Sequence, residues 1–525
     1  MSCLRPEVNE TAENLLPPEY YPIADADNTC SRFSFTYFKE FHAHAASYCE
    51  PGSRAKLTCF HRDSGFDMKT DSFCFAQGAA LNVEDGKFQL DCKLRQFSKQ
   101  EEEDGLLPLD RLPRYWYETG PSNVFALAID VRKSKPHPAG GGKETEEEKR
   151  QEASESFQQE TNPAVTPPKK LLLLKREGEG NPWHSLMEVF STYMSFDVLR
   201  MPGSSPGDNA PLFSDPGDPE DTQVVILDDR DDGPYFDLWT LFARRKPLRL
   251  GELLGDPSTA NNLKDVDLII PLAGSSNPFW KDDEQAQQCN NAPMLNVFSR
   301  RVLDFYGIQD LPIRKNDKPI VVTFVNRRET RRLQNQRFLT AELQRRNSRI
   351  NVQMVDFAAI PFSEQLRVAR ETDVLVGAHG AGLTQSLFMR RGAGAVVEIQ
   401  PEGLDYNSFR NVAGMLGLGY YRVHASTIPP EEWREGEEEE EEGTQPKGEN
   451  NLSRRTGNTK DRRTFRQNND DKESGENTAA AGASIGKRDD WHWRDIDIEE
   501  SRFFDVVEAA IRFMYTKGPW SYDLN

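Results

Sequence analysis

The residues with the clearest chemical potential form a glycine-rich turn between a strand and a helix. They follow a short β-branched run, and they are His379, Gly380, Ala381, Gly382 and Leu383. A helix that begins here presents unpaired backbone N–H groups and the positive end of its dipole, and glycines let a ligand approach the main chain closely. The turn therefore predicts a phosphate-binding site.

Three arginines are expected near the same edge of the domain. Arg327, Arg331 and Arg332 come directly after a run at 319–325 that is typical of a buried strand. Planar guanidinium groups suit bidentate contacts with phosphate oxygens. For any single arginine, a solvated helix face paired with nearby acids is the alternative. Their position after the strand favours a ligand role for Arg327 and Arg331 and leaves Arg332 open.

A candidate general base lies earlier in the chain. His184 falls at the start of an expected helix, and Glu188 is four residues further on. Residues four apart share one face of a helix, so Glu188 could orient the imidazole while His184 accepts a proton from an acceptor hydroxyl. A surface histidine with an incidental acid is the alternative.

One further glutamate is a candidate for donor binding. Glu398 lies at the end of an expected strand over 395–399. There its carboxylate could accept hydrogen bonds from ribose hydroxyls. A solvent-facing glutamate beyond the sheet is the alternative.

An acidic turn offers a second candidate site. Asp229 and Asp231 form a D-x-D pattern after an expected strand at 223–227, and in some enzymes such a pattern holds a divalent metal against a diphosphate. Acidic turns after strands are common, and the following segment begins a helix whose positive end attracts acids. We therefore expect a turn and no required metal, with a manganese-dependent enzyme as the alternative.

The elements around these residues alternate between strand and helix. The second unit has expected strands at 319–325, 351–355, 374–376, 395–399 and 420–423. Expected helices at 332–345, 361–371, 383–389 and 406–416 lie between them. A first unit uses strands at 170–174, 223–227 and 266–270. Such alternation predicts α/β domains with parallel sheets that bind ligands at the carboxyl ends of their strands.

A dinucleotide-binding oxidoreductase is the obvious rival for the glycine turn. Its fingerprint places a third glycine where this chain has Gln385, and it follows the first strand of its domain. Here the turn closes the third strand of its unit. Both departures disfavour that class.

The whole set of motifs resembles glycosyltransferase family 61. The resemblance covers about residues 170 to 428 plus the last helix, and it rests on HGAGL at 379–383, on NRRETRRLQN at 326–335, on the glutamate-containing strand at 396–399, and on NPWHSLMEVFSTY at 181–193. It implies an inverting transferase that needs no cofactor and takes a UDP-sugar donor and a glycoprotein or glycan acceptor. His184 and Glu188 would be catalytic, and the remaining candidates would bind the donor.

Within the family, the most similar members transfer N-acetylglucosamine to Ser or Thr of EGF-like domains. UDP-xylose as the donor, with transfer to an N-glycan or polysaccharide, is the main alternative. A non-catalytic nucleotide-sugar or glycan-binding protein is an alternative of another class. The net charge of −20 disfavours nucleic acid as a partner.

We expect an α/β fold of GT-B type, in which two Rossmann-like domains face each other. The expected segments are a cysteine-containing N-terminal region (1–132), a disordered linker (133–168), an acceptor domain (169–312), a donor domain (313–428), an acidic low-complexity insertion (429–490) and a closing C-terminal helix (491–525). Low hydrophobicity and charge runs, such as the glutamates at 437–442, explain the two disordered segments.

Cysteine usage bears on the compartment. Six of the seven cysteines lie in the first 92 residues, which favours a disulfide-braced N-terminal region and an oxidising environment. Sequons begin at Asn9 and Asn451. No signal peptide, anchor or membrane-spanning segment is visible, so we expect an upstream segment to be missing and the protein to work in the lumen of the endoplasmic reticulum or Golgi. A cytosolic protein is the alternative.

Overall fold

A computed structural model describes most of the chain outside its low-complexity segments. The described residues are 16–21, 29–63, 70–132, 168–203, 210–215, 217–241, 243–281, 285–309, 318–428, 491–492, 494–516 and 521–524. The expected insertions at 133–168 (apart from residue 168) and 429–490, both sequons and Cys3 lie outside them.

The first sheet joins strands from both ends of the N-terminal half. Its strands run in the order β1 (Ala45–Ser47), β2 (Lys56–Asp63), β3 (Thr70–Asn82), β9 (Lys264–Ile270), β6 (Lys170–Leu174), β7 (Thr222–Ile226) and β8 (Leu248–Arg249), with β4 (Lys87–Asp91) and β5 (Ile129–Arg132) branching from β3. The four strands from β9 to β8 are parallel, whereas β3 is antiparallel to β9.

The expected N-terminal region and the expected acceptor domain therefore share one sheet. The reason lies in β3, which is almost wholly buried and needs a strand on each side to satisfy its backbone. Disulfides Cys49–Cys92 and Cys59–Cys74 brace this region, and Cys30–Cys289 ties it to a segment 259 residues away. The prediction of a disulfide-braced N-terminal region is confirmed.

The second sheet carries the expected alternation. Its order is β11 (Ile350–Val355), β10 (Ile320–Val325), β12 (Val374–Ala378), β13 (Ala395–Pro401), β14 (Gly419–Ile428) and β15 (Asp495–Asp497), and β16 (Ser521–Leu524) also pairs with β14. The strands from β11 to β14 are parallel. Each strand predicted in this unit is present within a few residues, and the α/β class is confirmed.

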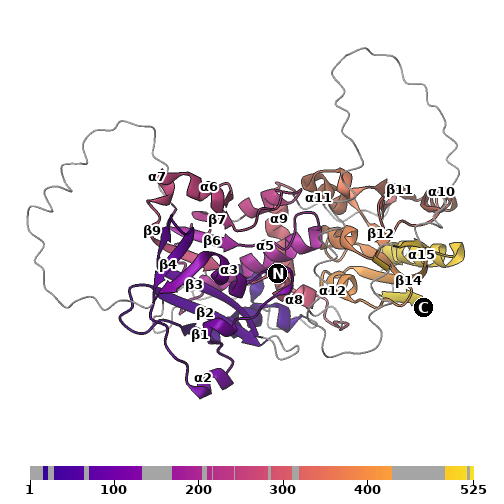
Figure 1. The fold of residues 1–525 in the computed structure, drawn as a ribbon. Coiled ribbons are helices and arrows are strands. Elements are labelled where there is room, and N and C mark those ends of the chain that lie inside the picture. The colour runs from indigo at the N-terminus through magenta and orange to yellow at the C-terminus, as the bar shows by residue number, and fades with distance from the viewer. Residues whose placement is uncertain are drawn as a thin grey trace, which may run out of the picture.

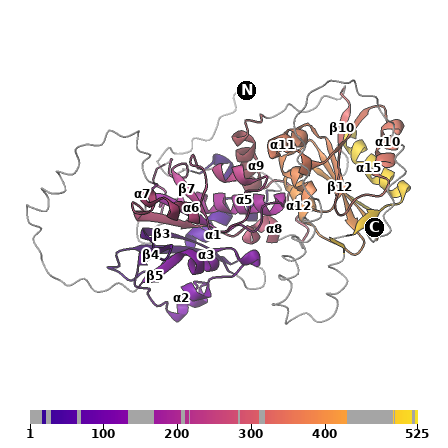
Figure 2. The same ribbon diagram turned by 45° about the horizontal axis from the view of Figure 1, so that its top comes forward.

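Helices lie between the two sheets (Figures 1 and 2), and residues of both halves form one shared apolar core. The leucine run of β6 buries both faces of its sheet, with Leu172 in the shared core and Leu171 and Leu173 in a second cluster on the outer face. Helices α5 (Pro182–Leu199), α9 (Pro293–Phe305) and α12 (Ser408–Met415) contribute Phe190, Phe298 and Phe409 to the shared core. The core residues of the two halves therefore pack against one another.

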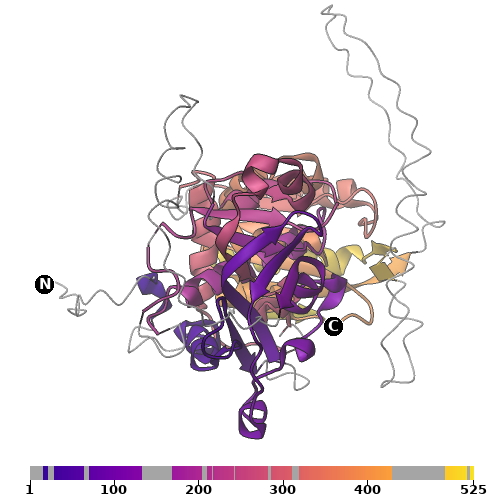
Figure 3. The ribbon, with the colours of Figure 1, turned by 60° about the vertical axis from the view of Figure 1, so that its left-hand side comes forward.

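The last helix covers the far side of the second sheet. It is α15 (Glu500–Thr516), and its apolar stripe packs with β12, β13 and β14 in a third cluster that includes Phe504, Val507 and Ile511. Viewed from the side of the first sheet, the N-terminal strands stand in front and the second sheet and its yellow C-terminal elements lie behind (Figure 3).

The remaining elements are shorter or flank these layers. The α-helices are α1 (Phe35–Ala43), α2 (Lys99–Glu103), α3 (Pro121–Ala128), α6 (Leu250–Gly255), α7 (Pro257–Ala260), α8 (Pro278–Lys281), α10 (Gln336–Arg346) and α11 (Phe362–Glu371). The 3₁₀ helices are η1 (Pro18–Tyr20), η2 (Ser31–Phe33), η3 (Leu109–Arg111), η4 (Trp116–Glu118), η5 (Phe236–Thr240), η6 (Gly274–Ser276), η7 (Phe357–Ala359) and η8 (Ala381–Phe388). Among the described residues, no helix has the length and apolarity needed to cross a bilayer.

Candidate active site

The second sheet has a topological switch point between β10 and β12. From β10 the chain passes through α10 to β11 on one side, and it then crosses back to β12 on the other side. Loops that leave neighbouring strands in opposite directions open a crevice at the carboxyl edge of the sheet. The loops after β10 and β12 contain the predicted arginines and the predicted glycine turn, respectively.

The glycine turn begins a helix where the sequence predicts one. The N–H of His379 still donates to Ile399 O in the sheet at 2.9 Å, and η8 begins two residues later with the N–H of Leu383 donating to Gly380 O at 2.9 Å. Gly380 has φ +130°, a conformation that essentially only glycine adopts. The helix is of the 3₁₀ type, and it begins at the carboxyl edge of the sheet, just after the end of β12.

The two glycines allow the loops to approach each other. A Cβ on Gly380 would lie 2.4 Å from Nη1 of Arg331, and a Cβ on Gly382 would lie 2.5 Å from Cγ1 of Val325. The turn thus packs directly against the end of β10 and against the loop that follows it. The packing of the two loops therefore requires glycine at both positions, whether or not a ligand binds.

Arg331 and Arg327 are half-buried beside the turn. Nη1 of Arg331 donates to His379 O at 3.0 Å, while its Nε is buried without a hydrogen-bond partner. Arg327 donates from Nε to Thr330 O at 2.8 Å. Burial lowers the pKa of both side chains, and together with the charge of Arg327 it lowers the pKa of Arg331 to about 9. Two adjacent, half-buried cations favour an anionic ligand, although the charges of Glu329 and Asp495 also act on Arg327.

The neighbouring arginines have partners of their own. Arg332 binds Asp495 of β15 through its backbone N–H, Nε and Nη2, the last at 2.7 Å. Arg328 is exposed and pairs with Asp356 at 2.9 Å. Arg332, which the sequence left open, therefore anchors the loop to the C-terminal segment.

His379 is held by a buried carboxylate. Its Nδ1 lies 2.5 Å from Oε1 of Glu398, and the hydroxyl of Tyr420 donates to Oε2 of Glu398 at 2.6 Å. Glu398 is fully buried, so the solvent-facing alternative is wrong. The carboxylate supports His379 and, through it, the turn; its contact with a ribose stays a prediction.

An aromatic group surrounds His379, and the sequence analysis missed it. The rings of Tyr406, Phe409 and Trp491 each lie 5.6 Å from the imidazole, and Trp491 also lies 5.3 Å from the guanidinium of Arg331. Trp491 follows a long insertion in the sequence, so only tertiary structure brings it to the turn. These rings form an aromatic surround for the imidazole beside Arg331.

The first sheet has a switch point of its own. Strand β6 pairs with β7 on one side and with β9 on the other, so the loops after β6 and β9 flank a second crevice. Helix α5 starts there, and Asn181 caps it by accepting the N–H of Trp183 at 3.0 Å. His184 thus lies in the first turn of α5, as predicted.

The carboxylate that faces His184 is Glu177. Its Oε2 lies 3.4 Å from Nδ1 of His184. The sequence analysis expected Glu188 in this role, and that expectation was wrong. Glu188 instead turns toward the sheet, where its Oε1 accepts the N–H of Glu177 at 2.8 Å. Burial, and then the charge of Glu177, raise the pKa of Glu188 well above its usual value.

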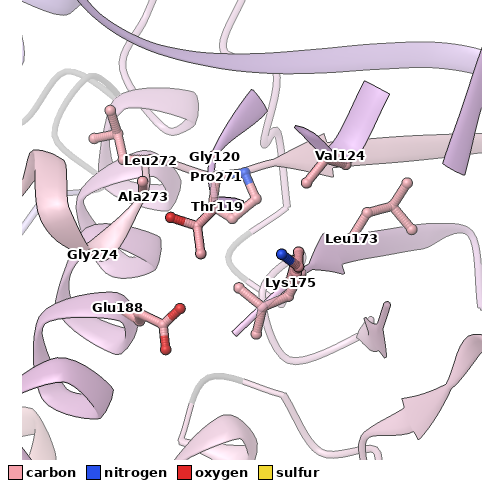
Figure 4. Close-up of a pocket in the computed structure, with 11 residues that line it drawn as sticks. Thr119, Gly120, Val124, Leu173, Lys175, Glu188, Pro271, Leu272, Ala273 and Gly274 are labelled. Atoms are coloured by element: carbon pink, nitrogen blue, oxygen red, sulfur yellow. The ribbon is translucent and has the colours of Figure 1, made fainter. Parts of the chain in front are cut away.

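A small cavity lies next to this carboxylate. Its lining includes Thr119, Lys175, Glu188 and Gly274, and Figure 4 shows the Glu188 side chain reaching into it from α5. On the other side of His184, the rings of Tyr117 and Trp280 lie 5.1 and 4.4 Å from the imidazole. The histidine is therefore held between two half-buried aromatic rings and a buried acid.

The acidic turn after β7 is clamped by one arginine. Arg176 donates to Asp228 through Nε and Nη2, the latter at 2.7 Å, and to the backbone oxygens of Arg230, Asp231 and Asp232. This is the structural turn that we expected. In the part of the chain that the structure describes, no group of three or more His, Cys, Asp or Glu side chains is arranged to hold a metal ion.

Aromatic packing connects the two crevices. The ring of Trp183, next to His184, lies 5.5 Å from that of Phe409, which in turn packs against His379. Helix α5 also contacts η8 directly. The predicted base and the predicted donor site therefore lie on opposite sides of one aromatic contact.

Comparison with known proteins identifies the family that this arrangement resembles. Residues 284–396 match the family model described as Glycosyltransferase 61. The match contains the arginine loop and the HGAGL turn, and it ends two residues before Glu398. The resemblance inferred from the sequence is confirmed, and it supports placing the chain among the glycosyltransferases.

Individual relatives agree with this class. An EGF domain-specific O-linked N-acetylglucosamine transferase of Drosophila melanogaster is 27% identical over 250 residues, which are 47% of this chain and 44% of that protein. The Bos taurus protein of the same name is 35% identical over 135 residues, 25% of each chain. A protein O-linked-mannose beta-1,4-N-acetylglucosaminyltransferase 2 of Tetraodon nigroviridis is 24% identical and covers 42% of this chain and 37% of that one.

The matched region spans less than half the length of these curated relatives. Among solved structures, the glycosyl transferase family 9 protein of Veillonella parvula covers 49% of this chain and 86% of its own, with 6% identity and a TM-score of 0.20. That score is too low to carry an argument about the fold.

Proposed function

We propose that the protein is an inverting glycosyltransferase that moves N-acetylglucosamine from UDP to a Ser or Thr hydroxyl of a glycoprotein. The observation that carries this proposal is the crevice at the switch point of the second sheet. Arg331 and Arg327 are half-buried there beside the backbone of Gly380, and Nε of Arg331 is buried without a hydrogen-bond partner. A diphosphate supplies the negative charge and the acceptor oxygens that this pair lacks.

The chemistry requires one proton acceptor and one site for a leaving diphosphate. The acceptor oxygen forms a bond to the anomeric carbon as the bond from that carbon to the diphosphate oxygen breaks. The electron pair of the broken bond stays on the diphosphate, next to Arg331 and the start of η8. The hydroxyl proton passes to Nε2 of His184, because Nδ1 faces Glu177. Attack from the face opposite the leaving group inverts the anomeric centre.

The arrangement of sheets supports a GT-B organisation. Each sheet opens a crevice at the carboxyl ends of its parallel strands, and Trp183 and Phe409 pack together between the two crevices. In this scheme, 313–428 form the donor domain and the first sheet supplies the acceptor side. No metal is required, because guanidinium groups and a helix start stabilise the diphosphate. The alternative of a manganese-dependent enzyme predicts that a chelator abolishes transfer.

The disulfides support an oxidising compartment. Three bridges lie within the described residues, and such bonds persist mainly in secreted proteins and in the lumen of the secretory pathway. We therefore propose a lumenal enzyme with a glycoprotein acceptor. The names of the relatives favour EGF-like domains as acceptors and N-acetylglucosamine as the sugar. UDP-xylose remains the alternative donor.

The decisive experiment separates donor binding from transfer. UDP binding is measured by calorimetry for the wild type, for Arg331→Ala and for the matched control Arg328→Ala. Loss of a buried, charge-assisted contact of about 2 to 3 kcal/mol weakens binding by roughly 30- to 150-fold for Arg331→Ala. Arg328→Ala, in the same loop but exposed, is expected to stay within twofold of the wild type.

The donor is then identified by incubating the wild type with a panel of UDP-sugars and an EGF-like domain. Transfer from UDP-N-acetylglucosamine supports the proposal, and transfer from UDP-xylose alone selects the alternative donor. A wild type that binds UDP and transfers no sugar from any donor is instead a nucleotide-sugar or glycan-binding protein. A wild type that does not bind UDP overturns the proposal.

A further inference from the structure

Two buried carboxyl groups meet at the crevice of the first sheet. Glu177 and Glu188 are only 2% and 3% exposed, and the N–H of Glu177 donates to Oε1 of Glu188 at 2.8 Å. The other contacts of Glu177 lead away from this pair. Its Oε1 accepts the N–H of Ser275 at 2.8 Å, and its Oε2 faces Nδ1 of His184 at 3.4 Å.

We propose that Glu177 is the positioning residue of His184, and that Glu188 keeps a proton so that the two carboxyl groups share a single negative charge. The inference rests on the proposed role of His184 as the base. It adds a residue that helical spacing does not indicate, since Glu177 lies before α5 and not on it.

The groups that face each acid decide which one is charged. Two carboxylates buried together do not both ionise at neutral pH, because each charge disfavours the other. Each carboxyl group accepts one backbone N–H through Oε1, and each Oε2 is buried without a hydrogen-bond partner. The two acids differ because Oε2 of Glu177 faces the imidazole of His184. The negative charge is therefore more stable on Glu177, and the raised pKa of Glu188 agrees with this distribution.

The close approach of the two acids depends on Gly274. A Cβ at this position would lie 2.7 Å from Cγ of Glu188 and 2.8 Å from Oε1 of Glu177. The loop after β9 can therefore cross both carboxyl groups only where a side chain is absent. This geometry explains how Glu188 of α5 and Glu177 of the preceding loop can be buried in contact with each other.

The neighbouring charges are engaged elsewhere. Arg176 forms its ion pair with Asp228 at 2.7 Å. Lys175 lines the same cavity as Glu188, but its Nζ pairs with Glu118 at 3.2 Å and donates to Tyr117 O at 3.2 Å (Figure 4). His184 is thus the cationic group that Glu177 is placed to balance once the imidazole has taken a proton.

The proton path follows from these contacts. The acceptor hydroxyl releases its proton to Nε2 of His184, and the proton already on Nδ1 stays between the ring and Oε2 of Glu177. The imidazolium that forms lies next to one negative charge. Glu188 takes no part in the transfer itself, and its proton limits the negative charge of the pair to one.

The test uses the full chain with UDP-N-acetylglucosamine and an EGF-like domain. Glu177→Gln is expected to lower kcat at least about 100-fold while the Kd for UDP stays within twofold. Glu177→Asp should have a kcat at least about tenfold higher than that of Glu177→Gln. Glu188→Gln should lower kcat by less than about tenfold relative to the wild type. The matched control is Glu179→Gln, in the same loop with a side chain that is 38% exposed, and it should retain wild-type activity.

A second cycle separates positioning from folding. In a His184→Ala background, Glu177→Gln should have no further effect, because residues that act as a unit are not additive. An equal loss in both backgrounds, or a larger loss for Glu188→Gln than for Glu177→Gln, overturns the inference.

A third measurement does not depend on turnover. It therefore tests the role of Glu177 even if no donor proves active. ¹⁵N NMR of histidine-labelled protein should place the His184 proton on Nδ1 in the wild type and redistribute it in Glu177→Gln. An unchanged tautomer overturns the inference. Loss of UDP binding by the wild type would instead overturn the proposed function.

Discussion

The two crevices of this molecule share a design and differ in charge. Each opens at a switch point between parallel strands, and each holds a histidine whose Nδ1 faces a fully buried glutamate. The distances are 3.4 Å from His184 to Glu177 and 2.5 Å from His379 to Glu398. The same pair of residue types therefore occurs twice on similar topology.

The surroundings of each pair decide what it can do. Next to His379 lie the half-buried guanidinium of Arg331 and the start of η8, which together favour an anion. Next to His184 lies the carboxyl group of Glu177, which in turn lies against Glu188, so acidic groups gather at this crevice. A histidine–glutamate pair is thus not in itself a catalytic signature, and the sign of the nearby charge separates a phosphate site from a proton acceptor.

Replacing each histidine in turn should give the largest effects and should separate the roles of the two crevices. His184→Ala is expected to lower kcat by roughly 10²- to 10⁴-fold, the usual contribution of a general base, with the Kd for UDP unchanged. His379→Ala should instead weaken UDP binding, because the ring supports the turn that faces the diphosphate. Steady-state kinetics and calorimetry on both variants check this. If both variants lose only kcat, or both lose only affinity, the division of roles is wrong.

A smaller effect is expected from crowding the basic crevice. Gly380→Ala places a Cβ 2.4 Å from Nη1 of Arg331 and forces alanine to adopt φ +130°. Strain of this kind costs about 1 to 3 kcal/mol, and displacement of the guanidinium should weaken UDP binding roughly tenfold or more.

The matched control is Gly403→Ala. Gly403 also has a positive φ (+83°), but a Cβ there meets nothing within 4 Å. Urea unfolding and UDP titration of both variants separate backbone strain from loss of the arginine contact. A Gly380→Ala variant that binds UDP like the wild type would mean that Arg331 is not the diphosphate ligand.

Local patterns were sufficient for most of the second sheet. Hydrophobic runs and glycine punctuation placed β10 to β14 within a few residues, and the turn at Gly380 was predicted because a strand, glycines and a helix follow one another directly. The grouping of Arg331 with that turn also followed from chain order, since parallel strands end at one edge.

Contacts between distant segments were not visible in the sequence. Strand β3 joins the first sheet next to β9, almost 190 residues later, because the backbone groups along both of its edges need partner strands that no local pattern identifies. Glu177 was missed for a related reason, since it approaches His184 by folding of a loop and not by helical spacing. The glycine at Gly274 is the signal that could have indicated such a close approach.

The smallest expected effect concerns stability and pH. Burial first, and the charge of Glu177 second, raise the pKa of Glu188, so the folded protein holds a proton that the unfolded chain has released. This contribution to stability is full below the unfolded pKa, about 4.3, and is lost as the pH rises toward the folded pKa. Within that window the free energy of unfolding falls by about 1.4 kcal/mol per pH unit.

Glu188→Gln cannot titrate, so it should gain stability relative to the wild type as the pH rises through this window. Urea unfolding from pH 5 to pH 8 measures the difference. Glu342→Gln provides a control of opposite sign, because hydrogen bonds from Arg345 and Arg346 lower the pKa of Glu342 to about 2. That variant should lose stability relative to the wild type by a constant amount from pH 5 to pH 8, and the loss should disappear only as the pH falls from about 4.3 toward 2. If Glu188→Gln instead loses stability as the pH rises, Glu188 is the charged member of the buried pair, and the roles assigned to the two acids must be exchanged.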